Sequence, residues 1–219
     1  MAKMTSGAWR RIGAAALVLT FLLVLINLVS GYQAFKKQLV QVESFRLNDS
    51  FDEIAYRHGS PPIVLGPLEP TMFEGKVAGH SRRVFYVGGA LGDQNTMPAG
   101  KTARQYQAWV YSPDALGTDL VVEFDPSGSV ESVTCTSFAA VRYACGPLAG
   151  IYTGDSEEKV LGLGRPARSG IEGGVKTIEY RDLGASFRLM EDKVYSMTLK
   201  RSTPGRNAAL SRYVEQLLP

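Results

Sequence analysis

The chain has 219 residues, of which 45% are hydrophobic and 21% are charged, and its formal net charge is +3 at pH 7. This composition is that of an ordinary folded protein and excludes the low-complexity and intrinsically disordered classes. The length allows one or two small domains, and the 23 glycines and 11 prolines indicate many turns.

An uncharged apolar run extends from residue 12 to residue 29 and reads IGAAALVLTFLLVLINLV. As a helix it would span about 27 Å, which is close to the thickness of the hydrocarbon core of a bilayer. A cleaved signal peptide is the alternative, but its apolar stretch is shorter, and Leu28-Val29-Ser30 is a poor small-x-small cleavage site. We therefore expect a transmembrane signal anchor over residues 12–31, in contact with the lipid bilayer, after a cytoplasmic tail over residues 1–11.

The charges that flank this run narrowly favour a cytoplasmic N-terminus, with Lys3, Arg10 and Arg11 before it and Lys36 and Lys37 after it. We predict a single-pass protein of the bacterial inner membrane with a periplasmic ectodomain. Without these five flanking residues, the rest of the chain contains 19 Lys and Arg and 21 Asp and Glu. The basic excess is thus a feature of the membrane segment, and no nucleic-acid partner is expected.

Amphipathic patterns border the ectodomain at both ends. Residues 32–46 carry apolar side chains at helical spacing, which predicts a helical stalk that leans on the ectodomain; the alternative is a helix that packs on a membrane partner. Residues 203–219 predict a C-terminal amphipathic helix with a stripe that includes Leu210 and Leu217. We expect this helix to pack on the ectodomain, with docking to a partner as the alternative.

Capping signals predict two short helices between these ends. Ser50 with Glu53, and Asp155 with Glu158, each fit a capping box at a helix start. Both helices end at a G-x-P sequence, where glycine provides a left-handed cap and proline stops the helix. Because helices of two to three turns are marginal alone, each needs a sheet to pack against.

Strand patterns follow each helix. The expected strands are residues 105–111, 119–124 and 129–136 in the first half, and residues 175–180, 185–190 and 194–200 in the second. Tyr111 in the first half matches Tyr180 in the second, and Phe124 matches Phe187. The predicted fold class is therefore α+β, with an N-terminal transmembrane helix followed by two repeats of a helix and an antiparallel meander. Because one helix on three strands is a minimal core, we expect the halves to share a sheet or to abut.

The two halves differ by a long insert, residues 62–104, in the first. The insert contains a strand-like run over residues 82–87 among glycine-rich loops. Long insertions often carry function, and the alternative is a hairpin that only extends the sheet. The ectodomain therefore divides into a first repeat over residues 47–144, which contains the insert, and a second repeat over residues 145–202.

This arrangement resembles a tandem repeat of the SmpA/OmlA (BamE-like) and β-lactamase-inhibitory-protein-like fold. The resemblance covers residues 47–201 without the insert, and it rests on a helix, G-x-P, a strand that ends in tyrosine, an apolar strand with Phe and a further strand, taken twice. It implies a non-enzymatic envelope protein that binds other proteins as an assembly factor, inhibitor or accessory subunit. A membrane anchor in place of a lipoprotein cysteine, and the insert, depart from the family pattern.

The residues themselves show no motif for catalysis, and neither a cofactor nor a metal is expected. His58 and His80 are the only histidines, and with two distant cysteines they do not make a closed zinc site. A pair formed by Ser81 and His80 without a placed carboxylate is weak support for a nucleophile. The chain also lacks the P-loop, H-E-x-x-H, G-x-S-x-G and Rossmann fingerprints.

The predicted function is therefore that of a non-enzymatic protein-interaction module, an accessory or assembly subunit of a bacterial envelope or inner-membrane complex. Two alternatives come from other classes. One is an anchored cell-wall or envelope hydrolase with its site in residues 62–104, and the other is a sensor of an envelope ligand.

Aromatic and basic residues are the candidates for binding a protein partner. Trp109 and Tyr111 lie on the same face of one strand, because side chains alternate along a strand. On an exposed face they would be natural interface anchors, and under the helices they would be core. Phe85 in the insert has the same two interpretations. Arg82 and Arg83 are either a solvated strand end or part of the partner-binding surface.

Cys135 and Cys145 are the only cysteines. Their spacing does not fit C-x-x-C redox chemistry, and no further ligands complete a metal site. In an oxidising compartment a disulfide is expected, and the alternative is two buried free thiols. The disulfide would close a loop of about eleven residues at the join between the two halves, worth roughly 3 kcal/mol in the chain-entropy model.

Overall fold

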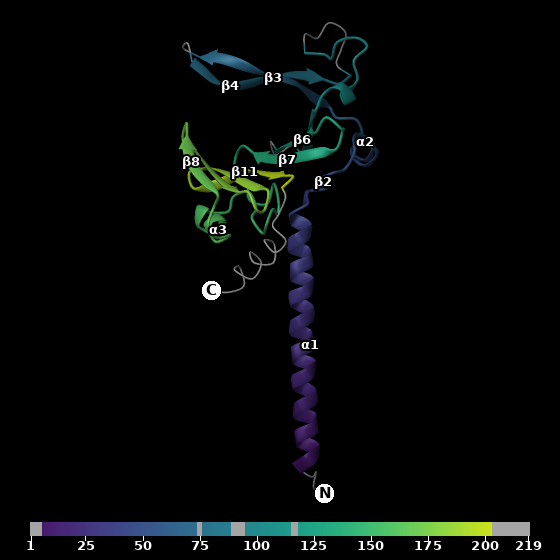
Figure 1. The fold of residues 1–219 in the computed structure, drawn as a ribbon, viewed down its shortest axis with the longest axis vertical. Helices are drawn as coiled ribbons and strands as arrows, with labels where there is room; N and C mark the ends of the chain where they lie inside the picture. Colours follow the sequence, from purple (N-terminus) through teal and green to yellow (C-terminus); the bar gives the residue numbers. More distant parts are fainter. Residues whose placement is uncertain (1–5, 74–75, 89–94, 115–117, 203–219) are drawn as a thin grey trace.

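The structure is a computed structural model that describes residues 6–73, 76–88, 95–114 and 118–202. A long helix, α1 (Ser6–Gln38), leads into an ectodomain built on one antiparallel sheet (Figure 1). With the short helices α2 (Phe51–His58) and α3 (Glu157–Leu161), the fold belongs to the predicted α+β class. The predicted C-terminal helix over residues 203–219 lies outside the described residues.

Helix α1 contains the predicted anchor. Its portion Leu17–Gln38 is long and apolar enough to cross a membrane, and residues 17–30 within it are exposed. The helix ends at Gln38, earlier than the expected stalk. A small hairpin follows, β1 (Gln41–Val42) with β2 (Phe45–Arg46). The prediction of a helix through residue 46 is wrong because Val42 and Phe45, 0% and 5% exposed, turn into the ectodomain core.

Within the described residues, nine strands form one sheet in the order β4-β3-β5-β6-β7-β11-β10-β9-β8, and every neighbouring pair is antiparallel. Their bounds are β3 Ile63–Phe73, β4 Lys76–Tyr86, β5 Ala108–Asp114, β6 Thr118–Phe124, β7 Val130–Ser137, β8 Arg168–Glu172, β9 Val175–Tyr180, β10 Ala185–Met190 and β11 Lys193–Lys200. All six expected strands are present. The last strand of each half, β7 and β11, pair at the centre, so the halves share the sheet.

Two strands of this sheet were not expected, β3 and β8. The insert holds a long hairpin, β3 with β4, and the strand predicted over residues 82–87 lies at the end of β4. The pattern of β3 is interrupted by Gly66, Pro67 and Pro70, and its pairing with β4 shifts register between Leu65 and Leu68, because proline cannot donate to a regular ladder. All five residues of β8 are exposed, so no apolar alternation marks this strand.

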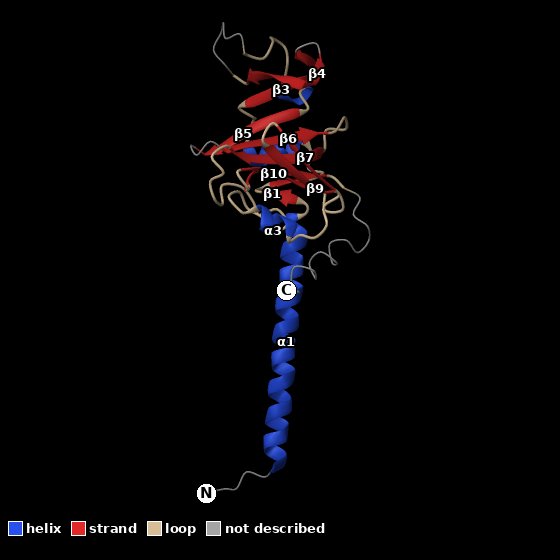
Figure 2. Ribbon diagram, turned by 90° about the vertical axis from the view of Figure 1, so that its left-hand side faces the viewer, coloured by secondary structure: helices blue, strands red, loops and turns tan. Residues whose placement is uncertain are grey.

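The core lies on one face of the sheet. One row of paired residues runs across seven strands, Val64, Trp109, Val122, Val133, Leu199, Ala185 and Tyr180, and all are buried. Helices α2 and α3 contribute Ile54 and Val160 to this core, and Figure 2 shows α3 beneath the sheet. The other face is polar at its centre, where the hydroxyls of Thr134 and Thr198 lie 2.9 Å apart. The sheet therefore has one core face and one face with polar chemistry.

The capping predictions have different outcomes at the two helices. At α2, the Glu53 amide donates to Ser50 Oγ over 3.2 Å, and the Ser50 amide donates to Glu53 Oε2 over 2.7 Å, so the predicted box is confirmed. At α3 no capping box forms. The Asp155 carboxylate instead accepts from the Tyr152 amide and from Lys159 Nζ, 2.8 Å and 2.7 Å away.

A disulfide joins Cys135 on β7 to Cys145, and both residues are fully buried. The predicted pairing is confirmed, because the two sulfur atoms lie at bonding distance. Cys145 belongs to the segment over residues 138–156, which we call the linker, between β7 and α3. The linker also reaches the end of α1: the Gly150 amide donates to Gln38 Oε1 over 2.7 Å. The disulfide therefore holds a segment that connects both halves of the sheet to the helix.

Candidate functional site

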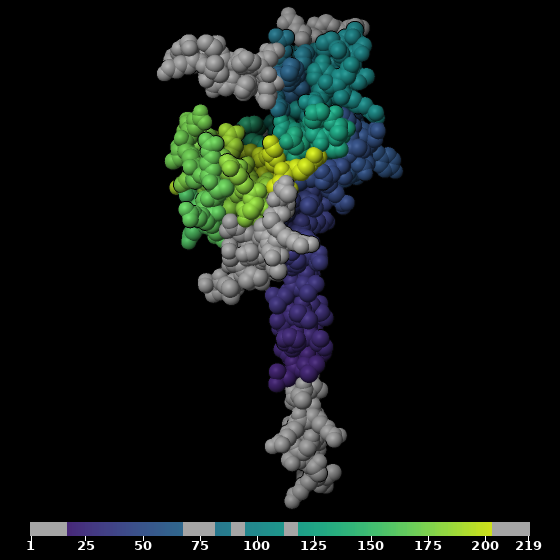
Figure 3. Space-filling model, viewed as in Figure 1, coloured from purple at the N-terminus to yellow at the C-terminus, as the bar shows by residue number. Residues whose placement is uncertain are grey.

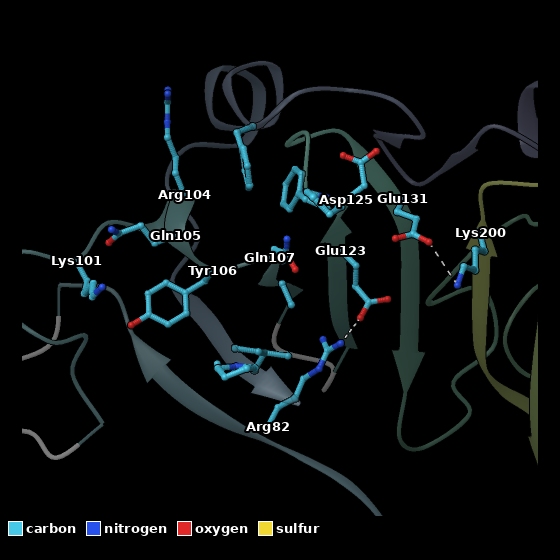
Figure 4. A pocket seen from close by; sticks show the side chains of 17 residues that line it. Arg82, Lys101, Arg104, Gln105, Tyr106, Gln107, Glu123, Asp125, Glu131 and Lys200 are labelled. Carbon is cyan, nitrogen blue, oxygen red and sulfur yellow. Dashed lines mark hydrogen bonds and ion pairs between the residues drawn. The ribbon is translucent and has the colours of Figure 1, made fainter. Parts of the chain in front are cut away.

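A cleft of about 800 Å³ lies between the β3–β4 hairpin, the segment before β5, and strands β6, β7 and β11 (Figure 4). We call it the polar cleft. Its charged lining comes from six parts of the chain, namely Arg82 of β4, Glu123 of β6, Asp125 of the turn after β6, Glu131 of β7, Lys200 of β11, and Lys101 and Arg104 before β5. Tyr106 adds an aromatic ring to the wall. A cavity of this size matches small-molecule sites, whose volumes are about 300–1,000 Å³.

The charges of the polar cleft are largely paired with one another. Arg82 Nη2 lies 2.5 Å from Glu123 Oε1, and Ser132 Oγ donates to the other oxygen of that carboxylate. Lys200 Nζ lies 3.5 Å from Glu131 Oε1. Arg104 pairs with Asp52 at the start of α2. Because each of these cations has an acidic neighbour, the cleft is not a strong anion site.

Asp125 at the rim of the cleft is held as a carboxylate. Hydrogen bonds from the Ser127 hydroxyl, the Arg201 guanidinium and the Ser129 amide, in that order of effect, lower the pKa of this carboxyl far below its usual value. Arg201 Nη1 lies 2.8 Å from Asp125 Oδ2. This contact ties the end of β11 to the turn between β6 and β7. Asp125 therefore has a structural role and cannot supply a proton near neutral pH.

The described residues near the cleft contain no candidate metal centre. No group of three or more His, Cys, Asp and Glu side chains could hold a metal ion there. His58 lies under the sheet, stacked 4.0 Å from the ring of Phe45, and burial, then the charge of Arg57, lowers its pKa. Burial raises the pKa of Tyr111 to about 12. The side chains of Ser81 and His80 lie outside the described residues.

Trp109 and Tyr111 lie in the core and do not form an exposed pair of anchors. They are 2% and 9% exposed, respectively. Trp109 Nε1 donates to the Ala103 carbonyl over 2.8 Å, and the Tyr111 hydroxyl donates to the Gly59 carbonyl over 3.0 Å. The partner-binding interpretation of these two residues is not supported, because their strand face is the one that the helices cover.

The other predicted partner residues lie either at the edge of the core or at the polar cleft. Phe85 is half-buried, packs against the core and lies 5.5 Å from the ring of Tyr106. Arg82 lines the polar cleft, and Arg83 is exposed next to it. Sequence reasoning missed Glu123, the partner of Arg82, because 41 residues separate the two. Only its position in an alternating strand could have indicated a side chain on the polar face.

The free edge of β8 is a second candidate site. Within the described residues, β8 pairs only with β9, through a two-residue turn at Gly173 and Gly174 with φ of 55° and 80°. Residues that flank such a turn form a hydrogen-bonded pair, and bonded pairs alternate with non-bonded ones along antiparallel strands. The backbone amide and carbonyl groups of Ser169 and Ile171 therefore point away from the sheet. Ile171 is 72% exposed.

Comparison with known proteins gave no match: no family model, no curated protein and no solved structure resembles the chain significantly. The geometry of the polar cleft and of the β8 edge is therefore the basis on which a function is proposed.

Proposed function

We propose that the chain is a non-enzymatic protein-interaction module, anchored in the bacterial inner membrane with its ectodomain in the periplasm. In this role it is an accessory or assembly subunit of an envelope complex. The observation that carries the proposal is the edge of β8, which within the described residues pairs only with β9 at the end of a nine-stranded sheet.

An open edge presents unpaired backbone groups that can pair with an extended strand of another protein. Natural proteins protect such edges with proline, lysine, bulges or a covering segment. Strand β8 contains no proline or lysine, and its pairing with β9 shows no register shift. The centre of the strand, Ser169-Gly170-Ile171, is uncharged, and its charges stand at the ends, Arg168 and Glu172. These features suit docking of a partner strand.

The proposed location is supported by two independent features. Helix α1 is long and apolar enough to span a bilayer, and the basic residues at its two flanks narrowly favour a cytoplasmic N-terminus. The disulfide between Cys135 and Cys145 is stable in an oxidising compartment such as the bacterial periplasm.

The tandem-repeat interpretation is part of the same proposal. In the first half, the Tyr111 hydroxyl donates to the carbonyl of Gly59, the glycine of the first G-x-P. In the second half, Tyr180 donates to the carbonyl of Gly164, the glycine of the second, over 3.2 Å. Tyr111 and Tyr180 therefore make equivalent contacts, each with the glycine that follows the helix of its own half. This equivalence supports the resemblance to tandem BamE-like repeats with residues 62–104 as an insert.

Sensing of a small envelope ligand is the second candidate function, and the volume of the polar cleft favours it. A hydrolytic site in residues 62–104 has less support. Among the described side chains of that segment, the charged groups at the cleft include Arg82 and Arg104, which are paired with acidic residues.

The test uses the full-length chain, tagged and purified from membranes in mild detergent after chemical crosslinking. We expect a stoichiometric protein partner to co-purify with the chain, and Ile171→Pro should abolish its binding. Proline removes the outward amide of residue 171 and leaves the hydrogen bonds of Gly170 to β9. Ile171→Ala keeps the amide and is the matched control, and Arg82→Ala reports on the cleft. A partner that Ile171→Pro retains, or a monomer without any partner, would overturn the proposal.

A further inference from the structure

The chain passes from α1 directly into the ectodomain (Figure 3). Helix α1 continues unbroken to Gln38, and Phe35, inside its last turns, is only 4% exposed and belongs to the ectodomain core. Gln38 Oε1 accepts the amide of Gly150, and Glu43 Oε1 accepts the amide of Gly146 over 3.0 Å. The height and tilt of the ectodomain relative to α1 are therefore set by packing.

This joint lies very close to the bilayer. Phe35 comes six residues after Val29, the last residue of the apolar run, which corresponds to about 9 Å along a helix. The headgroup layer on each side of the hydrocarbon core is about 5–8 Å thick. Figures 1 and 2 show α3 and the loops beneath the sheet at about the level of the last turns of α1. Packing of Phe35 thus brings this underside of the ectodomain down to the lipid headgroups.

The linker supplies the side chains suited to that position. Tyr143 is 59% exposed and lies three residues before Gly146, the residue bonded to Glu43. Its backbone has φ of 63°, an uncommon conformation for a tyrosine, and its amide donates to the Thr153 carbonyl over 3.2 Å. The guanidinium of Arg142 lies 4.8 Å from the centre of its ring. A rigidly held tyrosine with an adjacent arginine is an amphipathic pair typical of membrane interfaces.

Charge on this underside also favours anionic lipid. Lys36 and Lys37 stand exposed on the last turns of α1, next to the half-exposed Val40. Two acidic side chains at the start of α3 are paired within the protein. Asp155 pairs with Lys159 over 2.7 Å, and Glu157 pairs with Lys176 over 2.5 Å.

We propose that Arg142 and Tyr143, which we call the membrane seat, lie in the headgroup layer of the bilayer that holds α1. The inference rests on the proposed anchor and adds a second, peripheral contact with lipid. The linker then does more than connect the two halves beside the disulfide. It fixes how the ectodomain stands on the membrane, and hence the direction in which the β8 edge faces a partner.

The test places a fluorescent probe beside the seat. Val141→Cys puts an introduced thiol next to Arg142 and Tyr143 and leaves both in place; without reductant the native disulfide does not react. The full chain is labelled with a nitrobenzoxadiazole probe and reconstituted into vesicles of phosphatidylethanolamine and phosphatidylglycerol. Spin-labelled lipid, with the nitroxide near the headgroup, should quench this probe about twofold or more if the seat reaches the interface. Tyr56→Cys on α2, where the native side chain is 92% exposed, is the control and should stay unquenched.

Two further measurements separate the possible outcomes. Adding Tyr143→Ser to the Val141→Cys chain should reduce the quenching, because the aromatic anchor is lost. Flotation of the vesicles reports independently whether α1 is embedded. A chain that floats while both probes remain unquenched would overturn the seat and leave the anchor intact, whereas a chain that does not float would remove both.

Discussion

The hydroxyl of Tyr111 donates a hydrogen bond to the carbonyl of Gly59, and this contact fastens the end of α2 to the central sheet. Gly59 has φ of 77°, so its carbonyl is turned out of the helix and is available to the tyrosine. Tyr180 makes the corresponding contact in the second half, where its hydroxyl reaches the carbonyls of Val160 and Gly164 over 2.7 Å and 3.2 Å. Short helices that cannot persist alone are thereby held on the sheet.

Replacing either tyrosine by phenylalanine should destabilise the ectodomain without changing its fold. Tyr111→Phe removes one hydrogen bond and should cost about 1 kcal/mol of the free energy of unfolding. Tyr180→Phe should cost more, about 1–3 kcal/mol, because Tyr180 is fully buried and two carbonyls lose their donor. Urea titration measures both values. Tyr56→Phe on the exposed face of α2 is the control, and equal costs for all three variants would contradict this role.

Removal of the disulfide should lower stability by about 3 kcal/mol in the chain-entropy model, since the crosslink restricts the unfolded chain. The Cys135→Ala, Cys145→Ala double variant tests this in the same urea titration. Alkylation of the unreduced, denatured wild-type protein should modify neither cysteine. Two freely alkylated thiols would show that the pair exists as buried thiols instead.

Stability should depend on pH through His58. Burial lowers the pKa of His58 in the folded state, so the unfolded chain, with a pKa of about 6.5, binds the proton more readily. The folded protein should therefore lose stability as pH falls below about 6.5 and until the lowered folded pKa is reached. His58→Phe keeps a ring stacked on Phe45 and removes the titration.

The measurement for His58 is the difference in unfolding free energy between wild type and His58→Phe at several pH values. Both chains share every other titrating group, including Glu43, whose pKa is raised by burial, so those contributions cancel. The wild type should lose stability relative to the variant on going from pH 7.5 to acidic pH. Parallel curves would exclude a buried, neutral His58.

Gly184 should not tolerate a side chain. It has φ of 64°, and a Cβ atom there would collide with the carbonyl oxygen of Lys200. Gly100 has φ of 79° but open space around it, so Gly100→Ala measures the backbone conformation alone, about 1–2 kcal/mol. Gly184→Ala should cost about 1–3 kcal/mol beyond that value, because β10 and β11 must shift. Thermal unfolding of the two variants compares them directly.

Short sequence patterns were sufficient to predict several elements of the fold. The box between Ser50 and Glu53 is formed, and the strands β9 and β10 have the bounds that their alternating residues indicate. The pairing of Cys135 with Cys145 is also as expected. In contrast, β3 and β8 were missed, because prolines interrupt one pattern and exposure on both faces erases the other.

The sequence by itself determined the long apolar helix, the short capped helix α2, the alternating strands and the disulfide, since each depends on residues close together in the chain or on chemistry that only two residues can supply. Tertiary structure alone decided which face of the sheet is covered, and so placed Trp109 in the core. It also brought Arg82 to Glu123 at the polar cleft and placed β8 at the end of the sheet that the described residues form. These features depend on which strands pair and in which register, and that choice comes from the packing of the whole sheet.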